Sequence, residues 1–151
     1  MTALAAPRLV PVKGESCGLV RCLPVKGSTK IYNGAVVMLD ASGYAAPAAA
    51  ASGNNALVVP GIAEETVDNS AGSDGDLYVR VKACDEESAY GFNNDGTDTC
   101  TAAHVGKLAY LTDDNTVANA QSSTNRPIAG YIHSVDDDGQ VYVTVPGRKL
   151  S

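Results

Sequence analysis

The chain has 151 residues, of which 44% are hydrophobic, and a net charge of −6, which suits one globular domain or two small half-domains sharing a core. No stretch approaches the roughly 20 consecutive apolar residues of a membrane-spanning helix, so no membrane partner is expected. Because the chain begins without the charged region of a signal peptide, we expect synthesis in the cytosol, and the acidic balance argues against nucleic acid as a partner.

The N-terminal segment differs in charge from the rest of the chain. Residues 1–30 hold five basic residues against Glu15 alone, whereas the remainder holds six basic and 16 acidic residues. Three prolines interrupt residues 1–24. We expect this segment to be an extended arm that binds a negatively charged partner surface through basic side chains. The alternative is that it supplies the first strand of the body. The basic residues predicted to bind are Arg8, Lys13, Arg21 and Lys26.

From there on the sequence is typical of short β-strands. Val, Ile and Tyr are enriched in short runs, and Gly, Asn, Asp and Ser separate the runs. The Ala-rich residues 47–52 allow one helical turn at most. The predicted fold is therefore all-β, a small β-barrel or β-sandwich. The expected strands lie at 9–13, 18–25, 34–39, 56–63, 76–83, 107–111, 127–135 and 140–145.

An internal duplication is the strongest pattern in the chain. "GDLYVRV" at 75–81 returns as "GQVYVTV" at 139–145, and three earlier elements match in the same order. We therefore predict an arm at 1–24 and a body at 25–151. The alternative is that all-β chains resemble one another through shared composition. The body is divided into repeat A (25–83), an acidic insertion (84–100) and repeat B (101–146).

The two matched strands also predict which face is buried. Their aliphatic residues alternate with polar residues and one tyrosine each, so the aliphatic face points to the core. Tyr78 and Tyr142 are then on the outer face. Tyrosine is favoured at protein interfaces, which makes both residues candidates for a subunit interface. The alternative is that they are simply good strand formers.

No motif in the sequence indicates an enzyme, a metal site or a cofactor. Cys17, Cys22, Cys84 and Cys100 lack the close spacing of zinc ligands and are expected to be reduced thiols. A Cys84–Cys100 disulfide and a metal site remain alternatives. The oxygen-rich residues 68–76 favour a turn over a weak calcium site. We expect no catalytic residue, because nothing nominates a nucleophile with a base beside it.

The first repeat combines five short motifs in a fixed order: a "G-x-x-V-x-L" strand, a "D-x-x-G" turn, an Ala-rich strand, a "G-[IV]-A" strand and a "G-x-x-V-x-V" strand. The corresponding residues are Gly34–Leu39, Asp40–Gly43, Tyr44–Ala48, Gly61–Ala63 and Gly75–Val79. This pattern resembles the capsid decoration, or cement, proteins of tailed bacteriophages. The resemblance covers residues 25–83 well and the second half more loosely.

This resemblance implies a structural protein of the virion. Such a protein is made in the host cytoplasm and binds the outer surface of the shell, often as a homotrimer, where it stabilises contacts between copies of the major capsid protein. The basic arm would dock on the capsid while the acidic body faces solvent. The alternative function is a carbohydrate- or receptor-binding β-module, which would show exposed aromatic rings or a bound calcium ion.

Overall fold

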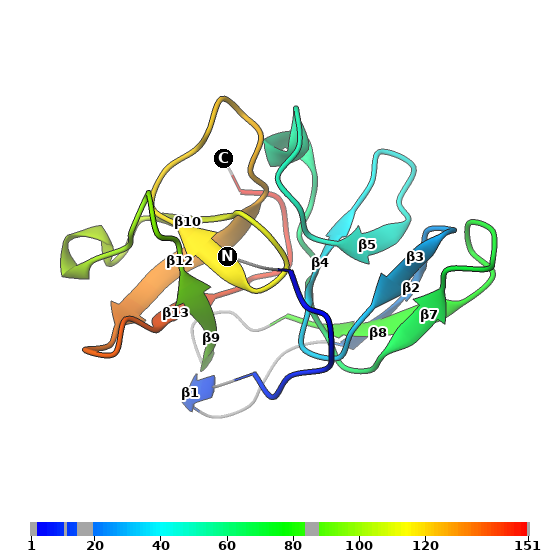
Figure 1. Ribbon diagram of the computed structural model, residues 1–151, viewed down its shortest axis with the longest axis horizontal. Helices are drawn as coiled ribbons and strands as arrows, with labels where there is room; N and C mark the ends of the chain where they lie inside the picture. The colour runs from blue at the N-terminus through cyan, green and yellow to red at the C-terminus, as the bar shows by residue number, and fades with distance from the viewer. Residues whose placement is uncertain (1–2, 11, 15–19, 84–87, 151) are drawn as a thin grey trace.

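The structure is a computed structural model that describes residues 3–10, 12–14, 20–83 and 88–150. Among these residues the regular secondary structure consists of short strands and two 3-10 turns, which confirms the predicted all-β class. Figure 1 shows two β-units side by side, with the earlier strands in blue to green and the later strands in green to red. Among the described residues, no helix is long and apolar enough to cross a membrane.

The first unit spans residues 20–83 and is built on a five-stranded sheet, in the spatial order β2, β8, β6, β4, β5. A parallel bridge between Val25 and Ala45 brings β5 back beside the end of β2, so the sheet curls toward a barrel. Strands β3 and β7 pair with each other outside this sheet. The elements are β2 Val20–Pro24, β3 Thr29–Ile31, β4 Val36–Leu39, β5 Ala45–Pro47, the 3-10 turn η1 Asn54–Ala56, β6 Gly61–Ala63, β7 Val67–Asn69 and β8 Tyr78–Lys82.

The second unit spans residues 88–146 and is a closed five-stranded barrel. Its strands follow in the order β9, β11, β10, β12, β13, and pairing of β13 with β9 closes the ring. The N-terminal strand β1 pairs antiparallel with the first residues of β9, and β11 pairs with its last residues. The elements are β1 Val12–Gly14, β9 Ser88–Asn94, the 3-10 turn η2 Ala102–His104, β10 Leu108–Leu111, β11 Thr116–Ala118, β12 Ile128–Val135 and β13 Val141–Thr144.

The two units share one topology, as the predicted duplication requires. Strands β2, β4, β5, β6 and β8 take the same places as β9, β10, β11, β12 and β13. Even the parallel contact recurs, since Lys26 donates its N–H to the Ala45 carbonyl oxygen just as Asp95 donates to that of Val117, both at 2.9 Å. Strand β9 is therefore the first strand of the second repeat. The prediction of an insertion over 84–100 is wrong, because residues 88–94 form this strand.

Gly61 and Gly130 occupy matching places and show how the repeats align. A Cβ on Gly61 would lie 2.3 Å from the carbonyl oxygen of Lys82, and one on Gly130 would lie 1.6 Å from that of Thr144. Only glycine allows this close approach of two strands. Lys82 and Thr144 are thus counterparts. The sequence match of residues 75–81 with 139–145 instead aligned Thr144 with Arg80, so the structural alignment of β13 differs from it by two residues.

Each unit encloses its own apolar core. Val79 and Val81 are buried between exposed neighbours on β8, and Val141 and Val143 are buried on β13, as the alternating pattern predicted. Leu77 is an exception, because it is exposed just before β8 begins. The first core comprises Val25, Ile31, Ala35, Val37, Ala45, Ala63, Val67, Val79 and Val81.

The joint between the units is also apolar. Val36 and Ile62 belong to the first unit, yet they are buried in the same cluster as Tyr90 and the interior of the second barrel. The Val36 N–H donates across the joint to the carbonyl oxygen of Asp114 at 2.8 Å. One face of the first unit, formed by β4 and β6, is therefore covered by the second unit.

Candidate functional site

The N-terminal strap, residues 3–10, runs across the joint and is dark blue in Figure 1. The Leu4 N–H donates to Oδ1 of Asp114 in the second unit at 2.9 Å. The Arg8 N–H donates to the carbonyl oxygen of Asn33 in the first unit at 3.1 Å. The strap is thus bound to both units of its own chain.

Arg8 is the main link between strap and joint. Its Nε donates to the carbonyl oxygen of Gly34 at 3.0 Å, and its Nη1 donates to that of Gly91 on β9 at 3.0 Å. Its guanidinium also lies over the Phe92 ring, 5.4 Å from the centroid. The planar fork of arginine suits this task, because it reaches carbonyls of both units at once.

The electrostatic setting of Arg8 combines burial with two nearby acids. Burial lowers the pKa of the guanidinium, and Asp114 and Asp113 act against this shift. Burial also raises the pKa of Asp114. Gly34 leaves room for the strap, since a Cβ there would lie 2.7 Å from the Arg8 carbonyl oxygen and its backbone has a φ of +90°.

The prediction of a basic arm over residues 1–24 is wrong for the described part of that segment. Arg8 is half-buried in the joint, Arg21 is exposed on β2, and Lys26 lies 2.9 Å from Asp40 in an ion pair. Lys13 lies on β1, and its side chain is outside the described part. Both β1 and β2 are strands of the body, as the alternative expected, because their backbones complete the two sheets.

A surface with an exposed tyrosine and two half-buried side chains, here called the β8 patch, consists of Tyr78, Pro24 and Tyr44. Tyr78 lies directly opposite Pro24 in the β2–β8 pair and is 60% exposed. A Cβ on Gly75 would lie 3.5 Å from the Tyr44 ring and 4.0 Å from Pro24, so these side chains adjoin. An exposed group of aromatic and apolar side chains is typical of a binding surface.

Tyr142, the second predicted interface residue, lies in a different setting. It is only 8% exposed, and its hydroxyl donates to Oε1 of Gln140 at 3.2 Å. Because of the two-residue shift between the repeats, Tyr142 is the counterpart of Arg80 and not of Tyr78. Its prediction as an exposed interface residue is therefore wrong.

A second exposed surface, here called the β12 face, consists of Val105, Leu108 and Tyr131. Tyr131 lies opposite Leu108 in the β10–β12 pair and is 41% exposed. Val105 is exposed just before β10. The sequence interpretation did not single out these residues, although Tyr131 alternates with buried Ile132 as an outward-facing residue should.

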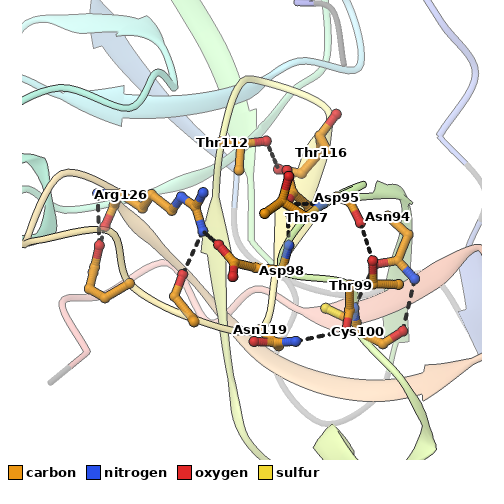
Figure 2. Close-up of polar contacts among 12 residues, drawn as sticks. Asn94, Asp95, Thr97, Asp98, Thr99, Cys100, Thr112, Thr116, Asn119 and Arg126 are labelled. Carbon is orange, nitrogen blue, oxygen red and sulfur yellow. Dashed lines mark hydrogen bonds and ion pairs between the residues drawn. The ribbon is translucent and has the colours of Figure 1, made fainter.

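Figure 2 shows the loop that follows β9, which is held by side chain to backbone hydrogen bonds. Oδ2 of Asp95 accepts the N–H groups of Thr97 and Asp98 at 2.9 and 2.6 Å. Arg126 donates to Oδ2 of Asp98 at 2.7 Å and to the carbonyl oxygen of Ala120 at 2.8 Å. These acids are used in fixing the loop.

The acids of the 68–76 loop, considered as calcium ligands in the sequence, also accept hydrogen bonds from the backbone of their own loop. In the 68–76 loop, Asp68 accepts the Ser70 N–H and Asp76 accepts the Ser73 N–H. Within the described ranges, no three His, Cys, Asp or Glu side chains are grouped so that they could hold a metal ion.

Cys100 is a buried thiol whose pKa is raised to about 11 by burial, with a contribution from Asp95. Cys17 and Cys84 lie outside the described residues, and so does the Cys84–Cys100 disulfide considered as an alternative.

No protein-family model, curated protein or solved structure matches this chain. The surfaces described above and the resemblance of the first repeat are therefore the observations that bear on function.

Proposed function

We propose that this protein is a structural virion protein that binds the outer surface of a phage capsid and stabilises contacts between major capsid subunits. The β8 patch is the observation that carries the proposal. It places the exposed ring of Tyr78 beside Pro24 and Tyr44 on the outside of the first unit, and tyrosine is enriched among the residues that supply most of the energy of protein interfaces. The strand and turn pattern of residues 25–83, which resembles that of decoration proteins, supports the same function.

The docking mode differs from the free arm expected from the sequence. The strap is bound within its own chain, so the shell-binding surface is placed on the β8 patch instead. Lys26 borders this patch, since its partner Asp40 also accepts the Tyr44 N–H at 2.9 Å. Lys26 is thus a binding residue in this proposal as well, at the rim of the β8 patch.

The test is co-sedimentation with expanded empty shells assembled from the major capsid protein of the same genome. The variant Tyr78→Lys places a charge in the centre of the patch and is expected to weaken shell binding at least tenfold. Asp137→Lys places the same side chain in an exposed hairpin loop, with a change of two charge units against one for Tyr78→Lys, and is expected to bind as the wild type does. Equal binding by both variants would overturn the placement of the site.

A second function is favoured by one specific observation. Tyr44 and Tyr78 are aromatic rings that both adjoin Pro24, and stacking on such rings beside polar groups is a common way to hold a sugar. A wild-type protein that ignores every shell but binds a glycan, with the affinity lost in Tyr78→Lys, would favour the carbohydrate-binding alternative.

A further inference from the structure

The duplication allows each surface of one unit to be compared with its counterpart in the other. Gly34 donates its N–H to Ala63 at 2.9 Å, and Gly106 donates to Ile132 at 2.8 Å. Both glycines have positive φ, +90° and +84°. These matching contacts make Ile62 the counterpart of Tyr131. By the same alignment Val36 corresponds to Leu108. Val36 lies opposite Ile62 in the β4–β6 pair, and Leu108 lies opposite Tyr131 in the equivalent β10–β12 pair.

The two counterpart faces differ in what covers them. In the first unit, Ile62 is only 5% exposed because the face is covered by the second unit, and Gly34 lies against Arg8 of the strap. In the second unit, Tyr131 is 41% exposed. A Cβ on Gly106 would meet no atom within 4 Å. The β12 face is thus exposed, whereas the equivalent face of the first unit, at Val36 and Ile62, is buried against the second unit.

The surface of the second unit that covers Val36 and Ile62 has an equivalent in the first unit, and that equivalent is exposed. The first unit's face is covered by Tyr90 of β9, and β1 pairs with the edge of that strand. The equivalent strand in the first unit is β2, where Arg21 stands at the place of Tyr90. Beyond the bridge at Val25, no described strand lies beside β2 on the side away from β8, and Val20 is exposed there.

We propose that the chain associates with itself head to tail: the β2 edge of one copy, at Val20 and Arg21, packs on the β12 face of the next. This contact between two chains has the same arrangement as the joint between the two units within one chain. Arg21 of one copy would then lie at Tyr131 of its neighbour, an arrangement that cation–π attraction stabilises. Because the two surfaces differ, the contact is heterologous, and it forms a ring where the rotation from one copy to the next closes.

This inference does not depend on the proposed function, and the two can fail separately. Tyr78 lies at the opposite end of the β2–β8 pair from Val20. Tyr78→Lys is therefore expected to leave self-association unchanged while it weakens shell binding. The same variant serves as a matched control here, since it adds a lysine on the same unit.

Native mass spectrometry and sedimentation of the full chain at high micromolar concentration test the proposal. Wild type and Tyr78→Lys are expected to form one discrete oligomer, and Val20→Lys and Tyr131→Lys are expected to be monomers with unchanged melting temperatures. Mixing the two monomeric variants is expected to give a heterodimer, since one intact joint remains between them.

Three results would overturn the proposal. The first is a monomeric wild type. The second is that Val20→Lys or Tyr131→Lys assembles as the wild type does. The third is that the two variants stay monomeric when mixed, because the intact β2 edge of Tyr131→Lys would then not bind the intact β12 face of Val20→Lys.

Discussion

Arg8 provides the sharpest test of how the two units are held together. The variant Arg8→Ala removes the hydrogen bonds to the carbonyl oxygens of Gly34 and Gly91, each 3.0 Å long, and the contact with the Phe92 ring. Hydrogen bonds to a charged group contribute roughly 1.5–3 kcal/mol each, and an arginine over a ring contributes about 0.5–1 kcal/mol.

Part of this loss is offset. Nη2 of Arg8 is buried and has no hydrogen-bond partner among the described residues, so truncation also relieves a desolvation cost. Such a cost is about 1–3 kcal/mol. The expected net loss in the free energy of unfolding is about 2–4 kcal/mol. For a chain of this size the melting temperature should fall by about 5–15 °C.

Thermal unfolding followed by circular dichroism and by calorimetry measures this effect. Arg8→Lys is the matched control, because it keeps the charge but a lysine cannot bridge both carbonyl groups, and it should fall between wild type and Arg8→Ala. An unchanged melting temperature in Arg8→Ala, combined with lost shell binding, would refute the strap and favour a free basic arm.

Three further outcomes follow from single sites. Gly130→Ala should destabilise the protein by several kcal/mol in urea unfolding, because the added Cβ meets a β13 carbonyl oxygen, whereas Gly96→Ala should be nearly neutral. Burial raises the pKa of Asp114, so its charged form costs stability above that raised pKa and the cost is lost as the pH falls through it. Asp114→Asn should therefore be the more stable protein at about pH 7, with the difference shrinking toward about pH 4 in denaturant titrations, and a constant difference would contradict this cause. Alkylation with peptide mapping at mildly alkaline pH should modify exposed Cys22 and spare Cys100, whose thiol pKa is raised to about 11; equal labelling would contradict its burial.

The sequence predicted the fold class and the duplication because both depend on short-range patterns. Alternating strands, Gly and Asp turns and the paired Gly61 and Gly130 repeat in order along the chain. The register of the last strand could not be predicted in the same way. A shift of two residues keeps every side chain on its face, so "VYV" fits either alignment equally well.

The strap and strand β9 were missed for a related reason. Arg8 looks like an exposed basic residue in sequence, and only the joint between units shows that carbonyl groups of Gly34 and Gly91 surround it. Strand β9, "SAYGFNN", has the glycine and asparagines of a loop, and its strand form depends on pairing with β13 and β11. Tertiary context overrides local propensity at such positions.

The difference between Tyr78 and Tyr142 also depends on tertiary structure. Both tyrosines occur in the same local pattern, yet one is 60% exposed and the other 8%. Sequence alternation gives the face of a strand, but what covers that face is decided by elements far away in the chain. The β12 face illustrates the same limit, since its exposure is apparent only by comparison with the covered face of the first unit.

Binding of the wild-type protein to expanded phage shells tests the central claim most directly. Purified shells saturated with the protein should gain mass corresponding to a fixed number of copies per major capsid subunit, and should resist heating better than bare shells. Shells that gain no mass at saturating protein concentration would contradict the account of this chain as a capsid decoration protein.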